Sequence, residues 1–332
     1  MTFVFIIICL NILIISKFDL IFKNINIYDY PDKNRKFHKK PMLLVGGLIV
    51  FINYLFVLLM IFFSESNQFI INLAYENSNF TWIIGPILIF LVGIYDDKKN
   101  LSGNLKFIIL SFIYFIILYF DKSLILTNLE FKTTSFNINL GPYSFLFTYL
   151  CLMIFSNAFN MLDGVNLQAG IYTVVVLILF LIKIGFNYDL IIIILSMLSY
   201  LFLNYKGKTF LGDSGTYLIS YIISIIFIKS YNSDRLFLCD EIFMIMILPG
   251  LELIRLFLIR GINKKNPLMP DRQHIHHLLQ NKFAKISFLK ISLLTNVTSF
   301  IFAIAFLIYP NLILFAMSII FYISTIKFLK KS

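Results

Sequence analysis

The sequence predicts an all-α polytopic membrane protein with a small extracytoplasmic β-hairpin. Of its 332 residues 59% are hydrophobic and 14% are charged, and the mean hydropathy is +0.88. Soluble domains are about 45–50% apolar and about 25% charged. The apolar residues gather in segments close to the roughly 20 residues that cross a bilayer. We expect residues 1–332 to form one integral-membrane domain.

Eleven apolar segments are candidate membrane spans. We expect the first to be a retained helix, because it lacks the basic start and small-residue cleavage site of a signal peptide. Pro310 and Asn311 are expected to form the turn between the last two. The predicted spans cover residues 2–22, 42–63, 80–95, 105–120, 143–160, 167–185, 188–204, 213–230, 240–260, 286–308 and 311–328.

The basic residues predict the orientation of these spans. If the spans alternate in direction, 23 of the 28 Lys and Arg residues fall on one side. Because positive charge marks the cytoplasmic side, we expect the N-terminus outside and the C-terminus in the cytoplasm. All four histidines, and Asp96, Asp97, Asp163, Asp213 and Asp271, then lie on the cytoplasmic side.

The net charge of +11 is consistent with this orientation and with anionic lipid headgroups as partners, so no nucleic-acid partner is expected. The three cysteines form no CxxC pair, which predicts neither a disulfide framework nor a zinc site. Residues 131–141, FKTTSFNINLG, alternate apolar and polar side chains and end at Gly141-Pro142. This pattern predicts a β-hairpin between the fourth and fifth spans.

The first polar constellation leads into the second span, and the second lies between the third and fourth spans. Residues 31–47, PDKNRKFHKKPMLLVGG, are either a positive-inside anchor or a ligand-binding loop containing Arg35 and His38. Their double glycine allows close approach of backbone to backbone or to a ligand. Residues 96–106, DDKKNLSGNLK, are either a solvated loop in which Lys98 and Lys99 pair with the carboxylates, or a functional carboxylate pair at the membrane boundary.

Two more constellations lie at helix ends. In NAFNMLDGV, residues 157–165, Asn157, Asn160 and Asp163 recur every three residues and share one helical face. They either bond neighbouring helices or bind a ligand, and we favour the ligand. In GKTFLGDSG, residues 207–215, Asp213 begins a helix. It is either a helix N-cap or a Mg²⁺ ligand beside a phosphate cradle.

The fifth constellation is NPLMPDRQHIHHLL, residues 266–279, in the longest cytoplasmic loop. It contains Arg272 and three histidines, His274, His276 and His277. Their spacing does not match a zinc site on a helix, and no cysteine accompanies them. We therefore expect cationic or hydrogen-bonding contact with a phosphate.

Together the five constellations resemble the polyprenyl-phosphate N-acetylhexosaminyl-1-phosphate transferase family, glycosyltransferase family 4. The resemblance runs in order from about residue 29 to residue 280 and includes NxxNxxDG, FxGDxG and HxHH. It implies transfer of a HexNAc-1-phosphate, GlcNAc by default, from a UDP-sugar to undecaprenyl (polyprenyl) phosphate, with release of UMP. It also implies Mg²⁺, or alternatively Mn²⁺, and an active site on the cytoplasmic side of a bacterial cytoplasmic membrane. A homodimer is common among relatives.

Within that family, eleven spans and PDRQHIHH favour the branch that starts O-antigen or other cell-envelope polysaccharides. The phospho-MurNAc-pentapeptide translocase of peptidoglycan synthesis is the alternative. A polytopic transporter is a distant alternative. Such a transporter requires a charged residue near the centre of a span, and we expect none of the spans to carry one.

The resemblance also implies roles for residues. Asp213 and Asn160 match the metal site, Asp163 matches the nucleotide pocket, and Phe210 matches a residue near the uracil. Asp96 and Asp97 match aspartates associated with the acceptor phosphate. The whole predicted site comprises catalytic Asp96, Asp97, Asp163, Asp213, His274, His276 and His277, and substrate-binding Arg35, His38, Lys106, Asn157, Asn160, Asn166, Phe210 and Arg272.

Three residues depart from the family pattern. Where the family has DGxDGLA, Asn166 replaces an aspartate and Leu167 a glycine; Glu252 also stands where aspartate is common. Because the second pKa of a phosphomonoester is about 6, the acceptor needs little help from a base. We expect the Asp96–Asp97 pair to orient the acceptor through a shared proton or a bridging lysine. A covalent phospho-Asp route is the alternative.

Overall fold

The computed structural model describes residues 2–31, 38, 40–63, 80–134, 136–234, 236–266, 272–283 and 285–330. Each of the eleven predicted spans contains a helix. The helices are α1 (Thr2–Ser16), α2 (Phe18–Phe22), α3 (Gly46–Phe63), α5 (Gly85–Lys99), α6 (Gly103–Phe120), α7 (Ser144–Leu162), α8 (Gln168–Ile184), α9 (Tyr188–Tyr205), α10 (Gly212–Asp234), α11 (Cys239–Ile245), α12 (Ile247–Ile262), α13 (Ile275–Lys282), α14 (Phe288–Ile308) and α15 (Leu312–Lys330).

In the described part of the chain, six helical segments are long and apolar enough to cross a membrane, or seven if the bent pair α11 and α12 forms one span. Helices α1, α3 and α8 contain shorter apolar stretches. The protein is therefore a mostly helical, multi-pass membrane protein.

Three predicted spans differ in detail. The first is divided into α1 and α2, and the ninth bends by 76° between α11 and α12. Pro249, in the first turn of α12, explains this bend because proline cannot continue a helix from the preceding turn. The third opens with a π-helical turn, Phe80–Ile84, and α5 then runs to Lys99. Asp96 and Asp97 thus lie within a helix and not in a loop.

Two small sheets complete the fold. Strands β3 (Asn128–Glu130) and β4 (Asn137–Asn139) pair antiparallel, which confirms the hairpin, although its first strand precedes residue 131. A second sheet, which the sequence did not predict, has the order β1-β2-β5 and comprises β1 (Tyr28–Asp29), β2 (Met42–Leu44) and β5 (Thr209–Phe210). Strands β2 and β5 lie far apart in the chain and pair in parallel, so no local turn or alternation marks this sheet.

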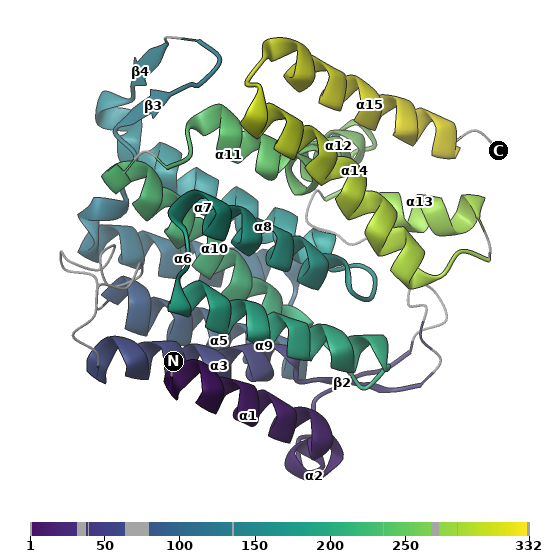
Figure 1. Cartoon of the computed structure of the whole chain (residues 1–332). Helices are drawn as coiled ribbons and strands as arrows, with labels where there is room; N and C mark the ends of the chain where they lie inside the picture. Colours follow the sequence, from purple (N-terminus) through teal and green to yellow (C-terminus); the bar gives the residue numbers. More distant parts are fainter. Residues whose placement is uncertain are drawn as a thin grey trace.

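The long helices run side by side, and the two sheets lie at opposite ends of them (Figure 1). The β3–β4 hairpin is at one end, and β2, α13 and the C-terminus are at the other. Helix α10 is central, since every residue from Ser214 to Tyr231 is buried. Its N-terminus faces the end that carries β5.

Candidate active site

Glycines allow helices α3 and α5 to pack closely against the N-terminus of α10. A Cβ at Gly93 of α5 would lie 2.2 Å from Cα of Ser214, and one at Gly47 of α3 would lie 2.3 Å from the backbone nitrogen of Gly215. Any larger residue would therefore force these helices apart. This arrangement confirms that the Gly46-Gly47 pair permits close backbone approach, here to the backbone of α10.

Asp97 caps α10 from the neighbouring helix α5. Its Oδ1 accepts a hydrogen bond from the backbone N–H of Asp213 at 2.7 Å, and its Oδ2 accepts from the N–H and hydroxyl of Ser214 at 3.1 and 2.7 Å. Gly212, with φ of +75°, has no Cβ to obstruct this carboxylate. The alternative that Asp213 is itself the N-cap is wrong, because Asp97 satisfies the orphan amides.

The Asp213 carboxylate is consequently available to side chains from two other helices. Asn160 of α7 donates to Asp213 Oδ1 at 2.6 Å and to the Thr216 hydroxyl at 3.0 Å. Lys106 Nζ of α6 lies 2.8 Å from Asp213 Oδ2 and 2.6 Å from Asp96 Oδ2. Four helices thus contribute to one polar cluster, defined here as Asp96, Asp97, Lys106, Asn160 and Asp213.

The two adjacent aspartates have different partners. Asp96 is 1% exposed and pairs with Lys106, while its Oδ1 accepts from the N–H of Leu101 at 2.9 Å. Asp97 turns to α10. A bridging lysine is present, but it joins Asp96 to Asp213 and not to Asp97. Lys98 and Lys99 are exposed and do not occupy this position.

The segment after α7 lies beside the polar cluster. Asn157 donates to the carbonyl of Met153 in its own helix at 2.7 Å. Asp163 ends α7 and is half-buried, and burial together with the charges of Asp213 and Asp97 raises the pKa of its carboxyl. The backbone oxygen of Asn166 accepts from the Ser292 hydroxyl at 2.6 Å.

Leu167, one of the three departures from the pattern that the sequence resembles, adopts the left-handed conformation that glycine favours. Its φ is +73° and its side chain is buried. Its backbone N–H donates to Asn204 Oδ1 at 2.8 Å, and Asn204 Nδ2 donates to the carbonyl of Thr209 at 2.7 Å. The backbone path typical of glycine is therefore kept by a leucine, at a cost of about 1–2 kcal/mol.

The histidines form a second cluster, His274, His276 and His277, which meets the segment after α7. The ring of His276 is stacked on that of His274, with centroids 5.2 Å apart, and lies 4.5 Å from that of His277. A Cβ at Gly164 would lie 2.0 Å from the His276 ring. Burial, and then the neighbouring His274, His277 and Arg255, lower the pKa of His276.

The remaining predicted residues that the structure describes lie outside the polar cluster and the histidine cluster. The His38 ring meets that of Phe210 edge-on at 5.2 Å, beside the β1-β2-β5 sheet, and His38 Nε2 lies 3.6 Å from Asp29 Oδ2. Arg272, two residues before His274, is exposed. Arg35 lies outside the described residues. His276 and His277 belong to α13, where we predicted a loop.

The prediction missed Glu252 as an organising residue. It lies within α12 and is 4% exposed, so the expectation that no span carries a charge near its centre is wrong for residues 240–260. Its carboxylate accepts from the N–H of Ile275 at 2.7 Å and from Arg255. The sequence does contain a signal for this role, because a carboxylate and an arginine three residues apart in an apolar segment indicate a buried ion pair.

The polar cluster suits a hard divalent cation. In the part of the chain that the structure describes, no three His, Cys, Asp or Glu side chains form a metal cage. Mg²⁺, however, typically takes one or two carboxylates together with substrate phosphates. Asp213 and the amide oxygen of Asn160 would be oxygen ligands of this kind. The Lys106 ammonium contacts both Asp96 and Asp213, so one cationic group already lies between these two carboxylates.

Fold and site together define a multi-pass membrane protein whose polar groups converge at one end of a helical bundle. The sequence pattern of Glycosyl transferase family 4 matches residues 79–231. A probable undecaprenyl-phosphate N-acetylglucosaminyl 1-phosphate transferase of Bacillus subtilis is 30% identical over 264 residues, which cover 77% of this chain and 70% of that protein. An undecaprenyl-phosphate alpha-N-acetylglucosaminyl 1-phosphate transferase of Salmonella typhi is 27% identical over 77% of this chain and 69% of that protein.

A protein of the latter name from Thermotoga maritima is 25% identical over 79% of this chain and 76% of its own length. The chain belongs to glycosyl transferase family 4 and is a phospho-sugar transferase of that family.

Proposed function

We propose that this enzyme transfers a HexNAc-1-phosphate, with GlcNAc as the default sugar, from a UDP-sugar to undecaprenyl phosphate and releases UMP. The names of its relatives support these substrates. The observation that carries the proposal is the convergence of Asp97, Lys106, Asn160 and Asp213 from four helices on one end of α10. We further propose that O-antigen or another cell-envelope polysaccharide starts from the product.

In the proposed reaction, an oxygen of the lipid phosphate attacks the phosphorus that carries the sugar. A new P–O bond forms there, and the bond from that phosphorus to the oxygen shared with UMP breaks. UMP leaves with the electron pair, and the lipid keeps a diphosphate bearing the sugar. Since such transfers depend mainly on positioning and charge neutralisation, the protein must hold two anions close together.

The chain's own groups suit these tasks. Lys106, between Asp96 and Asp213, can donate to a phosphate oxygen. We propose that the histidine cluster, which lies beside Gly164, hydrogen-bonds the phosphates, and that Asp163, Asn166 and Phe210 hold the nucleotide. Asp213 and Asn160 would hold Mg²⁺, which when bound offsets negative charge on the diphosphate. Asp97 keeps the Asp213 backbone in place.

The acceptor phosphate is mostly ionised at neutral pH, because its second pKa is about 6. Direct transfer therefore needs no carboxylate base. The separate partners of Asp96 and Asp97 favour this direct route over a covalent phospho-Asp intermediate, since both carboxylates are engaged. A burst of UMP without acceptor lipid would support the covalent route instead.

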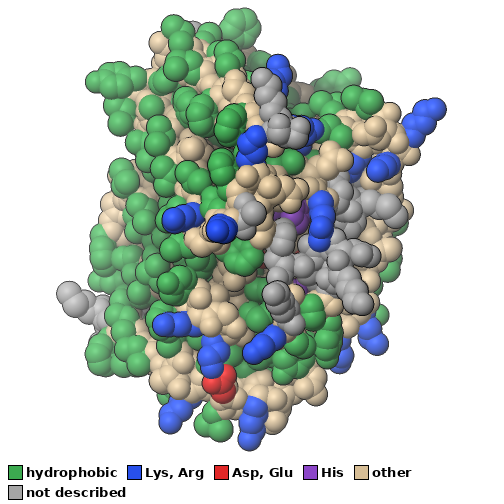
Figure 2. Space-filling model, turned by 90° about the vertical axis from the view of Figure 1, so that its right-hand side faces the viewer, with side chains coloured by type: hydrophobic (Ala, Val, Ile, Leu, Met, Phe, Trp, Pro, Cys, Tyr) green, Lys and Arg blue, Asp and Glu red, His purple; other side chains and the backbone are tan. Residues whose placement is uncertain are grey.

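We also propose that the chain has eleven spans and that its active site faces the cytoplasm of a bacterium. Figure 2 shows the end of the molecule that carries α13, where Lys and Arg side chains are spread over the face and a histidine lies among them. The positive-inside rule assigns such a face to the cytoplasm. UDP-sugars are soluble, so an opening toward that side would receive them directly.

UMP release tests the function. Purified protein in detergent should release UMP from UDP-GlcNAc only when undecaprenyl phosphate and Mg²⁺ are both present. Asp213→Asn should lower the rate at least about 100-fold, because it removes charge at the proposed metal site. Asp19→Asn, which alters an exposed carboxylate of α2, is the matched control and should keep full activity. Release without lipid acceptor would contradict the proposal.

A panel of donors then identifies the sugar. UDP-GlcNAc, UDP-GalNAc, a UDP-6-deoxy amino sugar and UDP-MurNAc-pentapeptide are compared at equal concentration with the same lipid. We expect a HexNAc donor to give the highest kcat/KM. Preference for UDP-MurNAc-pentapeptide would instead assign the chain to the peptidoglycan branch.

A further inference from the structure

A buried network centred on Glu252 holds the backbone of the histidine cluster. Its Oε1 accepts from the N–H of Ile275, the residue between His274 and His276, at 2.7 Å. The same oxygen accepts from Arg255 Nη2 at 2.7 Å, and Oε2 accepts from Arg255 Nε at 3.1 Å and from the Tyr322 hydroxyl. One carboxylate therefore joins α12, the start of α13 and α15.

Arg255 extends the same network to the residue before the histidines. Its Nη2 donates to the carbonyl of Gln273 at 2.6 Å, and its Nε donates to the Tyr322 hydroxyl at 2.9 Å. The backbone on both sides of His274 is thus bonded to one ion pair. Tyr322 is the member of the network that belongs to the last helix of the chain.

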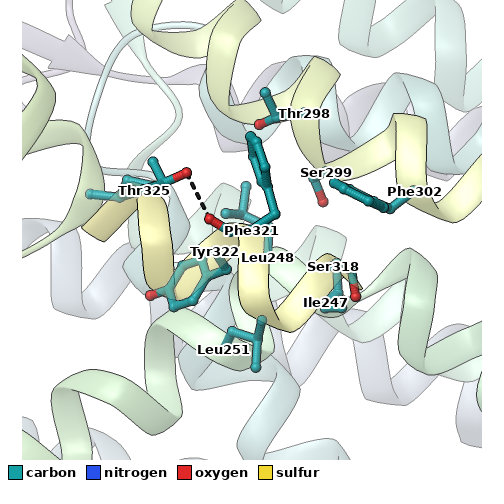
Figure 3. Close-up of a pocket in the computed structure, with 11 residues that line it drawn as sticks. Ile247, Leu248, Leu251, Thr298, Ser299, Phe302, Ser318, Phe321, Tyr322 and Thr325 are labelled. Carbon is teal, nitrogen blue, oxygen red and sulfur yellow. Dashed lines mark hydrogen bonds between the residues drawn. The ribbon is translucent and has the colours of Figure 1, made fainter. Parts of the chain in front are cut away.

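The ring of Tyr322 has a separate role from its hydroxyl. It lines a cavity of about 40 Å³ between α12, α14 and α15, together with Leu248, Leu251 and Ser299 (Figure 3). Ile275, the first residue of α13, also lines this cavity. The ring packs against these neighbours whether or not it carries a hydroxyl. Tyr322→Phe therefore removes the hydrogen bonds and leaves the packing in place.

We propose that Glu252, Arg255 and Tyr322 are positioning residues that set the histidine cluster for phosphate transfer, and that α15 acts on the site through the Tyr322 hydroxyl. This inference rests on the proposed function, in which the cluster contacts the phosphates. Transfer requires the groups that contact the phosphates to be placed to within a fraction of an ångström, and a shift of 1 Å can cost about 100-fold in rate. A buried network that fixes Gln273 and Ile275 supplies this placement.

The first experiment compares two tyrosine-to-phenylalanine variants in the UMP-release assay. Tyr54→Phe is the matched control, because the Tyr54 hydroxyl is also buried and donates to the carbonyl of Trp82 at 2.6 Å, away from the histidines. We expect Tyr322→Phe to lower kcat about 5–20-fold, with KM for the UDP-sugar changed less than about twofold. Both variants should show similar melting temperatures, and Tyr54→Phe should keep its activity.

The second experiment is a double-mutant cycle with His277→Gln. If Tyr322 acts through the histidine cluster, adding Tyr322→Phe to His277→Gln should lower kcat by less than about twofold further. A role confined to anchoring α15 would instead make the two effects multiply.

Each outcome decides between the proposals. Absence of UMP release by the unsubstituted chain would overturn the proposed function and the positioning role with it. Normal release with equal kcat for Tyr322→Phe and Tyr54→Phe, or multiplying effects in the cycle, would overturn the positioning role alone.

Discussion

Asp97 of α5 accepts hydrogen bonds from the first amides of α10, at Asp213 and Ser214. A carboxylate at a helix N-terminus satisfies orphan donors and meets the positive end of the helix dipole. The adjacent Asp96 instead pairs with Lys106. The two adjacent carboxylates are therefore stabilised in different ways, Asp96 by an ion pair with Lys106 and Asp97 by hydrogen bonds from α10.

Replacing Asp97 with asparagine should destabilise the protein and slow transfer. An asparagine offers one acceptor oxygen where the carboxylate accepts three hydrogen bonds, so part of the α10 cap is lost. We expect a loss of about 1–3 kcal/mol in stability and at least about tenfold in rate. Thermal unfolding and UMP release measure the two effects, with Asp19→Asn as control. An unchanged melting temperature would show that the cap contributes nothing.

Lys106→Gln should alter the response to Mg²⁺. The ammonium neutralises Asp96 and Asp213, so its removal leaves two carboxylates with no cation between them. We expect the half-saturating Mg²⁺ concentration to fall by about threefold or more while kcat falls about tenfold, because a competing cation and a phosphate donor are lost together. Magnesium titration of UMP release tests this. A higher magnesium requirement would contradict a shared cation site.

Leu167 should show an unusual order of substitutions. Both Leu167→Ala and Leu167→Gly lose a buried side chain, at a cost of about 2–5 kcal/mol for the alanine variant. Only glycine relieves the left-handed strain, since φ here is +73°. We expect the glycine variant to be more stable than the alanine variant by about 1 kcal/mol, the reverse of their order in a helix. Melting temperatures of the two variants test this order, and a higher value for Leu167→Ala would contradict it.

His276 should make stability depend on pH. Its folded pKa is lowered by burial and by His274, His277 and Arg255, so the unfolded chain binds its proton first on acidification. Stability from this group is complete above the ordinary pKa of about 6.5 and is lost as pH falls below it. The slope from one such group is at most about 1.4 kcal/mol per pH unit.

Melting temperatures between pH 7.5 and 5.5 test this dependence. His276→Gln should flatten the fall in stability, because glutamine takes up no proton in this range. An identical slope in the variant and in the unsubstituted protein would assign the dependence to other groups.

The sequence is sufficient to predict the helices, because a segment buried in lipid needs about 20 apolar residues and hydropathy detects such a run. It also predicted the polar groups that the structure brings together, including Asn160 and Asp213, from short motifs within single segments. The hairpin was visible as alternation over eleven residues that end at a Gly-Pro turn, whereas β2 and β5 are distant in the chain and no local pattern joins them.

How these groups pair follows from the packing of the helices in three dimensions. Asp96 and Asp97 are neighbours in sequence, yet one turns to Lys106 and the other to α10, because successive residues on a helix point about 100° apart. Glu252 and Tyr322 are 70 residues apart, and their hydrogen bond depends on how α12 and α15 pack. Hydropathy and local spacing contain no information on such contacts, since these depend on which faces of distant helices meet.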